Sequence, residues 1–257
     1  MNMPHLQPAL RVENLGVRYG ALVALDGVSW EVHAGELLGI IGQNGAGKSS
    51  CYDAVSALIP RSGKVFLHGK DISTVPAYHL AKLGIKRAFQ QNAFFDQLSV
   101  RENMTAALGG TAGLGTSILK PLAARRRARE LYREAGRRLT RFGLAEDCHD
   151  LRPHELSYGM QRMLSIVLAY GAGARVLLLD EPAAGLGGDD MAKLAALLCS
   201  LKGEGVALVV IEHHMDLIMS VADRIFVLNL GQPLACGNPA DIQRDPRVLQ
   251  AYLGNNA

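Results

Sequence analysis

The sequence predicts an α/β fold with a mainly parallel sheet and a helical insertion. Short apolar stretches alternate with helix-like ones along most of the 257 residues, as expected when strands are joined by crossover helices. Three of the apolar stretches, within 36–41, 175–180 and 207–212, are nearly continuous, which is typical of strands buried on both faces. Between 91 and 171 the strand pattern stops and helical patterns replace it.

The elements can be placed along the chain from these patterns. The expected strands are 28–33, 36–41, 64–69, 175–180, 207–212 and 224–229. The helical stretches are 99–104, 122–139 and a segment that begins near 157. We expect residues 1–257 to form a single domain with three parts. These are an α/β core (about 1–90 and 172–235), a helical subdomain (about 91–171) and a short helical tail (236–257).

Composition narrows the class of protein. Hydrophobic residues make up 49% of the sequence and charged residues 20%, which indicates a globular chain rather than a disordered one. Aromatic residues are only 5%, which does not favour a protein that binds single strands by stacking. The net charge of +3 is too small to imply a polyanionic partner. We therefore expect no nucleic acid partner.

The sequence does not indicate a secretory signal, a membrane-spanning helix or paired cysteines. The start, MNMPHLQPAL, lacks the basic and apolar regions of a secretory signal. No apolar run approaches the ~18–20 residues of a membrane-spanning helix. The four cysteines are scattered without C-x-x-C spacing, which favours reduced thiols in a cytosolic protein. A membrane role would therefore come through partners.

Two local features each allow two interpretations. Basic residues gather at 125–129 and 136–141, either as a solvated helix face or as a face near anionic lipid headgroups. Cys51 lies in the first turn after a glycine-rich loop, where a helix N-terminus can lower a thiol pKa. The favoured interpretation of Cys51 is a small packing residue, and protection from alkylation by ATP tests its exposure.

A phosphate-binding loop follows the strand 36–41. Residues 42–49 fit G-x-x-x-x-G-K-[ST], and a plausible helix comes next. The glycines let backbone N–H groups curl around phosphates, Lys48 supplies a point charge, and Ser49 offers an oxygen to Mg²⁺. The expected nucleotide contacts of this loop are Gly42, Asn44, Gly45, Ala46, Gly47, Lys48, Ser49 and Ser50.

An acidic pair follows a second buried strand. Asp180 ends the stretch 175–180, and Glu181 comes directly after it. At the carboxyl end of such a strand, both carboxylates would face the crevice in which open α/β sheets bind nucleotides. We expect Asp180 to hold Mg²⁺ through water and Glu181 to polarise the attacking water.

A second possible anion site begins the segment LSYGMQRMLSIVLAY at 156–170. Ser157 is a preferred N-cap, Gly159 leaves the first turn bare, and an apolar run follows. The free N–H groups of a capped helix start attract anions.

These motifs occur in an order that resembles the nucleotide-binding subunit of ATP-binding-cassette transporters. The order is 42–49, Gln90 in KRAFQQ, LSYGMQR, LLLDEPAAGLG and IEHHM, and the resemblance covers essentially the whole chain. It implies a RecA-like P-loop NTPase core, with an antiparallel β segment near the N-terminus and an inserted α-helical subdomain. ATP and Mg²⁺ are the implied cofactors.

The resemblance also implies individual roles. Tyr19 matches the aromatic residue that stacks on adenine, although a core tyrosine in a strand would look the same. Gln90 matches the residue that reaches the metal and the attacking water and senses the membrane subunit. His213 matches the histidine that contacts the γ-phosphate, and without the motif order His213 and His214 could not be told apart. The expected catalytic residues are then Glu181, His213 and Gln90, and the metal ligands are Ser49, Gln90 and Asp180.

In this family two nucleotide-binding subunits pair head to tail. Ser157 and the Gly159 N–H of one copy would then cap the γ-phosphate held by the other, so ATP would favour the closed pair. The implied partners are a second cassette (identical or a paralogue), two transmembrane permease subunits and, indirectly, a solute-binding protein. The implied location is the cytoplasmic face of the inner membrane, with peripheral attachment through the permeases.

Further features are similar to the branched-chain (hydrophobic) amino-acid importer group. They are the tyrosine in LSYG, the DEPAAGL run, IEHHMDLIMSVADRIFVLNLG and the ending DPRVLQAYLG. Importers of urea and short amides are very similar, so the solute stays open. Two competing functions are a soluble cassette ATPase acting on ribosomes or DNA, and a subunit that binds ATP without hydrolysing it. The chain has one cassette and no sustained heptads, which disfavours the soluble class.

Three positions depart from the family pattern. Met160 stands where the family usually has glutamine, Gln43 replaces a common proline, and Gly187 stands where other branches carry aspartate. We expect Gln43 only to loosen the loop, whereas Met160 and Gly187 point to a slow or asymmetric site.

Overall fold

The computed structural model describes residues 7–88, 94–109, 121–171 and 173–253. The chain divides into two compact units. The core unit comprises Met1–Arg87, Arg175–Ala184 and Leu198–Ala257, and the helical unit comprises Ala88–Ala174 and Gly185–Leu197. Each unit is described by itself below.

A six-stranded sheet carries the core unit. Its strand order is β10-β9-β3-β8-β7-β6. The strands are β3 (Leu37–Ile41), β6 (Ile85–Ala88), β7 (Val176–Asp180), β8 (Ala207–Ile211), β9 (Arg224–Asn229) and β10 (Gln232–Gly237). β3 pairs in parallel with β8 and β9, and β7 pairs in parallel with β8, while β10 runs antiparallel to β9. All residues of β3 and β8 are buried, which explains their nearly continuous apolar sequences.

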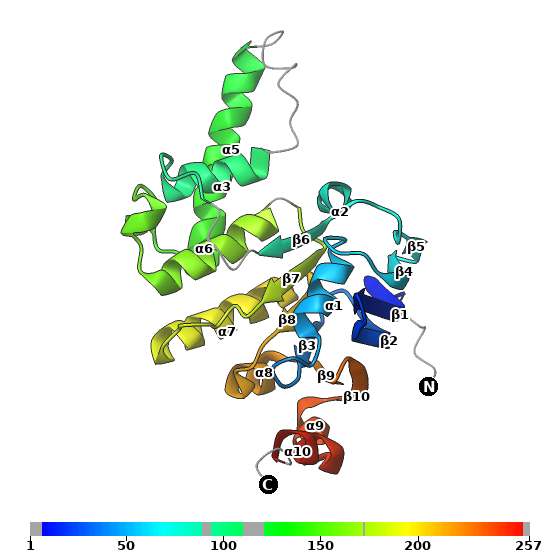
Figure 1. The fold of residues 1–257 in the computed structure, drawn as a ribbon. Helices are drawn as coiled ribbons and strands as arrows, with labels where there is room; N and C mark the ends of the chain where they lie inside the picture. The colour runs from blue at the N-terminus through cyan, green and yellow to red at the C-terminus, as the bar shows by residue number, and fades with distance from the viewer. Residues whose placement is uncertain (1–6, 89–93, 110–120, 172, 254–257) are drawn as a thin grey trace, which may run out of the picture. The chain divides into compact units, whose positions relative to one another are not determined.

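A smaller antiparallel sheet forms the expected β segment near the N-terminus. Its order is β2-β1-β4-β5, with β1 (Leu10–Tyr19), β2 (Leu22–Val32), β4 (Ser62–Leu67) and β5 (Lys70–Asp71). Helix α1 (Lys48–Val55) contacts β1 and β2 of this sheet and β7 and β8 of the larger one (Figure 1). The core therefore fills the space around α1, where Cys51, Tyr52 and Ala54 are buried.

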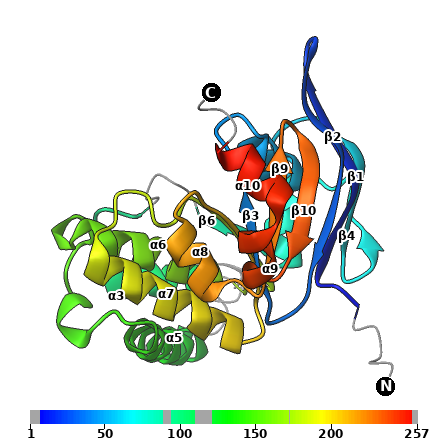
Figure 2. The ribbon, with the colours of Figure 1, turned by 90° about the horizontal axis from the view of Figure 1, so that it is seen from below.

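Two helices from the end of the chain complete the core unit. α9 (Pro239–Arg244) and α10 (Pro246–Leu253) lie beside β10 (Figure 2). α2 (Ala77–Leu83) and α8 (Met215–Val221) also belong to this unit. Asn238 caps α9 by accepting a 2.9 Å hydrogen bond from the Asp241 N–H. The Gln43 side chain donates to the Ala251 carbonyl, so α10 is tied to the phosphate loop. Gln43 therefore makes a contact that a proline at this position could not make, while the looser loop stays a prediction.

The helical unit is built on three packed helices. They are α3 (Val100–Gly109), α5 (Pro121–Arg141) and α6 (Tyr158–Gly171), and α3 contacts both of the others. Two short 3₁₀ turns, η1 (Glu146–Cys148) and η2 (Pro153–Glu155), join α5 to α6. Residues 185–197, which include the start of α7 (Gly188–Gly203), belong to this unit rather than to the α/β core. Their placement has a local cause, because Tyr158 packs on Gly185 and Asp190 on Gly159.

Among the residues that the structure describes, no helix is both long enough and apolar enough to cross a membrane.

Candidate functional site

The phosphate loop connects β3 to α1 through two glycines that no other residue can replace without strain. At Gly47, φ is +100°, and a Cβ would lie 2.6 Å from the Ala24 carbonyl oxygen. A Cβ on Gly42 would lie 2.3 Å from the Leu228 carbonyl oxygen. The loop thus packs directly on backbone from β2 and β9, which holds its N–H groups in place for an anion.

Lys48 begins α1 and folds back over the same loop. Its Nζ donates to the carbonyls of Gly42 (2.8 Å) and Gln43 (3.0 Å), and only 7% of the residue is exposed. Burial lowers the pKa of Lys48, and the carboxylates of Glu181 and Asp180 oppose that shift. Both carboxylates therefore act electrostatically on Lys48 at the end of the phosphate loop.

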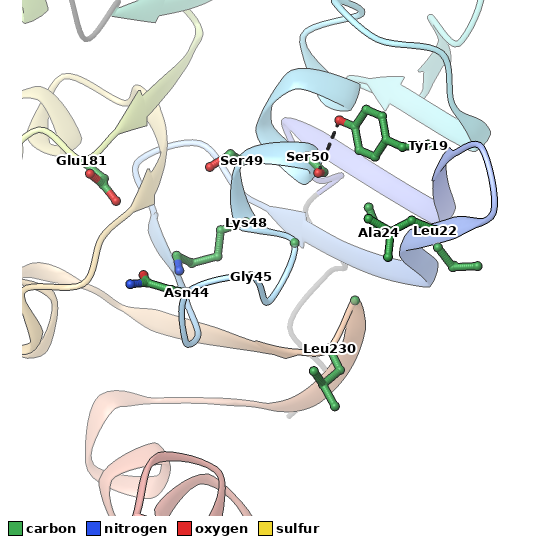
Figure 3. A pocket seen from close by; sticks show the side chains of 13 residues that line it. Tyr19, Leu22, Ala24, Asn44, Gly45, Lys48, Ser49, Ser50, Glu181 and Leu230 are labelled. Carbon is green, nitrogen blue, oxygen red and sulfur yellow. Dashed lines mark hydrogen bonds between the residues drawn. The ribbon is translucent and has the colours of Figure 1, made fainter. Parts of the chain in front are cut away.

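A cavity of ≈ 490 Å³ opens over the loop. Figure 3 shows Asn44 on the loop and Lys48 and Ser49 at the start of α1, with Glu181 across from them. Tyr19 lines the other end, where its hydroxyl lies 3.5 Å from Ser50 Oγ and where 49% of the residue is exposed. One cavity therefore offers a phosphate cradle and an exposed aromatic ring, which are the two parts that a nucleotide needs.

Sequence reasoning missed an apolar platform around Tyr19. Leu22, Val23 and Leu230 line the same cavity and are 65%, 38% and 82% exposed. Exposed leucines next to an aromatic ring suit the flat face of a base. The only sequence signal for the first two was their position soon after Tyr19, and Leu230 carried none because it comes from the distant β9–β10 turn.

The acidic pair sits where β7 ends. The Glu181 N–H donates to the Ile211 carbonyl (2.8 Å), and Glu181 has a left-handed φ of 45°, which is rare for this residue type. A strained backbone of this kind commonly marks a functional position. Glu181 lines the cavity, and the Ser49 hydroxyl and the Asp180 carboxylate are the oxygen donors that Mg²⁺ prefers. The donor set therefore fits a magnesium ion.

The side chains of the two histidines after β8 have different nearest partners. His213 Nδ1 lies 3.5 Å from Glu181 Oε1, whereas His214 Nδ1 lies 3.0 Å from Glu212 Oε2. Of the two, His213 is therefore the one that contacts the acidic residue at the cavity. His214 is held by the buried carboxylate beside it.

Glu212 is a functional residue candidate that sequence reasoning missed. Glu212 is fully buried. Its carboxylate accepts hydrogen bonds from the backbone N–H groups of Ala183 (2.7 Å), His213 (3.0 Å) and His214 (3.2 Å). One carboxylate thus ties the loop after Glu181 to the loop that carries His213. A buried charge is tolerated only when it is fully hydrogen-bonded in this way.

We expect Glu212→Gln to lower kcat for ATP much more than it changes KM. The glutamine side chain has one oxygen acceptor where glutamate has two. The N–H groups that bond Oε2 in the native protein therefore lose their acceptor, which lowers the free energy of unfolding by about 1–3 kcal/mol. Steady-state kinetics and urea unfolding measure the two effects. The control is Asp216→Asn, at an exposed position four residues after Glu212, which should change neither kcat nor the free energy of unfolding. If the two variants behaved alike, Glu212 would not position the residues around it.

The start of α6 has the capped form that the sequence predicts, with one addition. Ser157 Oγ accepts from the Met160 N–H at 3.3 Å. A Cβ on Gly159 would lie 2.2 Å from Asp190 Oδ2, so the missing side chain makes room for this carboxylate, which also pairs with Lys193 at 3.3 Å. An acidic group beside a helix N-terminus is favoured by the helix dipole. The turn at Gly159 is therefore not bare here, and a phosphate would compete with Asp190.

Gln90, the remaining predicted site residue, lies outside the described residues.

Cys51 is buried rather than reactive. Burial raises the pKa of its thiol to about 12, which excludes a lowered pKa at the helix start and favours the interpretation as a packing residue. The thiol therefore stays protonated at neutral pH.

We expect iodoacetamide at pH 8 to modify Cys199, which is exposed, and to spare Cys51 in the folded protein. Because burial and not nucleotide protects Cys51, ATP should not change this result. Peptide mass spectrometry with and without ATP, and with urea as the control that exposes both thiols, gives the answer. Rapid labelling of Cys51 in the native, nucleotide-free protein would show that its burial is wrong.

Comparison with known proteins gives consistent matches. A family model described as ABC transporter matches residues 25–184, which is more than half of the chain. A second model, described as branched-chain amino acid ATP-binding cassette transporter, matches residues 232–257.

Curated relatives cover nearly the whole chain. The high-affinity branched-chain amino acid transport ATP-binding protein LivG of Salmonella typhimurium is 36% identical over 252 residues (96% of this chain, 98% of the relative). BraF of Pseudomonas aeruginosa, with the same description, is 37% identical over 254 residues (96% and 98%). The lipopolysaccharide export system ATP-binding protein LptB of Acidithiobacillus ferridurans is 30% identical over 247 residues (96% and 97%).

Solved structures are similar over the same length. The ADP conformation of MJ1267, an ATP-binding cassette of an ABC transporter, has a TM-score of 0.81 at 29% identity (96% of this chain, 99% of that chain). A nucleotide-free ATP-binding cassette from an ABC transporter has a TM-score of 0.80 at 28% identity (96% and 99%).

Proposed function

The chain belongs to the ABC transporter family of ATP-binding proteins, and from that membership we propose that it is the ATP-hydrolysing subunit of a membrane importer. The observation that carries the proposal is the cavity that joins the phosphate loop, Lys48 and Glu181. It combines an anion cradle with a carboxylate, Glu181, that lines the same cavity. The importer's channel would be formed by the two separate permease subunits that the resemblance implies.

In the proposed reaction, Glu181 accepts a proton from the water that attacks the γ-phosphorus. The bond between that phosphorus and the β–γ bridging oxygen breaks, giving ADP and phosphate. Lys48 and the loop N–H groups offset the negative charge that develops on the phosphate oxygens. His213, 3.5 Å from Glu181, contacts the γ-phosphate and orients the carboxylate. Gln90 would contact the metal and the water.

Mg²⁺ bound by Ser49, Asp180 and Gln90 would neutralise phosphate charge. Ser49 is the second residue of α1, and Asp180 is the last residue of β7. Both residues therefore lie at the ends of regular elements. Such placement keeps the donors fixed without a bound ion.

We further propose that the site is completed by a second cassette. Ser157 and Gly159 lie in the helical unit, whereas the phosphate loop lies in the core unit. In the closed head-to-tail pair, the Gly159 N–H of one copy would reach the γ-phosphate held by the other, and Asp190 would give way to it. ATP then stabilises the pair, and hydrolysis releases it.

The proposed solute is a branched-chain or other hydrophobic amino acid. Support comes from the relatives named LivG and BraF and from the match at 232–257. The 30% identity to LptB, named for lipopolysaccharide export, is consistent with a cassette that does not itself contact the solute. Urea or short amides are the competing solutes. The cassette would sit on the cytoplasmic face of the inner membrane through its two permeases, with a solute-binding protein acting on their far side.

Reconstitution tests this function. The purified chain, combined with a second cassette and candidate permeases in vesicles, should hydrolyse ATP faster when a loaded binding protein is present outside. Leucine should enter those vesicles only with ATP, and urea or acetamide serve as the competing solutes. Stimulation by RNA or DNA with none by permeases would instead support the soluble cassette class, and absence of any turnover would support the non-hydrolysing one.

A further inference from the structure

The helical unit contains a second, strongly basic cavity that the nucleotide site does not use. It has a volume of ≈ 710 Å³ and lies between α3, α5 and the segment around η1. Four arginines line it (Arg101, Arg133, Arg137 and Arg141), against one carboxylate, Glu146. Like charges repel one another, and a cavity wall of this composition attracts an anion.

Three of the arginines come from one face of α5. Arg133, Arg137 and Arg141 are four residues apart, the spacing that puts side chains on the same side of a helix. Arg137 is partly balanced, because its Nη2 lies 2.7 Å from Glu134 Oε2. For Arg133, no ion pair is found with any residue in the described part of the helical unit. Within that part, Arg133 therefore presents an uncompensated charge to the cavity.

The fourth arginine, Arg101, comes from α3 and is held by a buried histidine. Arg101 Nη2 lies 2.8 Å from His149 Nδ1, and the Nε2 of this fully buried histidine lies 3.0 Å from the Leu144 carbonyl. Since a carbonyl only accepts, Nε2 carries the hydrogen and Nδ1 accepts from Arg101. The guanidinium also lies over the Tyr132 ring at 5.1 Å.

Arg101 packs beside Gly136 of α5. A Cβ at this position would be in ordinary van der Waals contact with Cζ and Nε of Arg101, at 3.4 Å from each, so the guanidinium lies close to this turn of α5. The Arg101 Nε is buried and has no hydrogen-bond partner among the described residues. The support for a ligand comes instead from the charges that line the cavity: Arg101 and the three arginines of α5 line it together, and several guanidinium groups around one cavity stabilise a bound oxyanion.

We propose that this cavity binds a phosphate-bearing ligand, with Arg101 and Arg133 as its main contacts. The two N–H groups of an arginine fork can bond two phosphate oxygens at once. A phosphate ligand, with its two negative charges, is also better matched to several guanidinium groups than a ligand with one carboxylate. The volume exceeds that of one phosphate, which leaves room for the organic part of the ligand. Two sources supply this chemistry: a phospholipid headgroup or a free phosphorylated metabolite. The proposal does not depend on the function proposed above.

The test uses the full chain saturated with ADP and Mg²⁺, so that the phosphate loop is already occupied. In one arm, pyrophosphate is titrated by calorimetry at 150 mM salt, a concentration that screens weak surface attraction (Debye length about 8 Å). In the other arm, flotation is measured with vesicles of phosphatidylcholine and phosphatidylglycerol (4:1) and with phosphatidylcholine alone. The variants are Arg133→Ala and Arg101→Lys, and the matched control is Arg127→Ala, an exposed arginine on α5 outside the cavity.

We expect binding in at least one arm, about tenfold weaker in Arg133→Ala and unchanged in Arg127→Ala. Arg101→Lys should also weaken it, because lysine keeps the charge but loses the fork. Pyrophosphate binding alone assigns a soluble ligand, and vesicle binding alone assigns a headgroup. No binding in either arm, or an equal loss in Arg133→Ala and Arg127→Ala, would overturn the proposal, since the second result is what diffuse surface charge produces.

Discussion

Replacing Glu181 by glutamine is expected to lower ATP turnover by about 10²- to 10⁴-fold, the usual contribution of a general base. The amide keeps the size of the side chain and its place in the cavity, but it cannot take a proton from water. Nucleotide contacts through Lys48 and the loop stay intact. ATP should therefore remain bound and hold two copies together, which light scattering detects as a doubled mass with ATP and Mg²⁺ but not with ADP.

The control for this variant is Glu130→Gln, which changes an exposed carboxylate in α5 that pairs with Arg126. It should turn over ATP like the wild type and should not accumulate as a pair. A Glu181→Gln protein that stays monomeric at saturating ATP would contradict the shared site. One that hydrolyses ATP at the wild-type rate would remove Glu181 from the mechanism.

Lys48→Ala is expected to weaken ATP binding by about tenfold to a hundredfold, the loss that corresponds to one charged hydrogen bond of about 1.5–3 kcal/mol. The buried ammonium is the point charge nearest to the expected β- and γ-phosphates. Fluorescent-nucleotide titration measures the loss. Lys64→Ala, an exposed lysine in β4, is the control. Because Lys48 also bonds the Gly42 and Gln43 carbonyls, a thermal melt should accompany the titration to show that the fold persists.

The same lysine predicts a pH effect. Burial lowers its pKa from the ordinary 10.5, so it loses its charge at a lower pH than an exposed lysine does. ATP affinity should therefore fall as pH rises through the alkaline range below 10.5. In Lys48→Ala this part of the pH dependence should disappear. If the decline were the same in both proteins, Lys48 would not be its cause.

Much of the larger sheet could be predicted because its strands are buried on both faces. β3, β7, β8 and β9 read as apolar runs, and their predicted bounds agree with the structure to within a residue or two. β10 could not be predicted, because none of its residues is fully buried and its sequence, QPLACG, contains a proline. β1 alternates buried and partly exposed positions, and such alternation gives a weaker signal than a continuous apolar run.

The site shows the same division. Motifs at fixed spacing located the phosphate loop and the acidic pair, which act on one another in the structure. Contacts between distant segments left no such trace. Glu212 has the sequence context of a strand end, and only the structure shows that Ala183, His213 and His214 donate to it. Likewise, the bond from Gln43 to Ala251 joins residues that are 208 positions apart, and no local pattern reveals it.

A structure of the Glu181→Gln variant with ATP and Mg²⁺ is the most direct test of whether two copies share one ATP site. We predict two copies facing each other, with the Gly159 N–H of one about 3 Å from an oxygen of the γ-phosphate that Lys48 of the other contacts. We also predict that Asp190 has left the side of Gly159. A nucleotide enclosed by one chain alone, with Asp190 still against Gly159, would show that no phosphate is shared between copies.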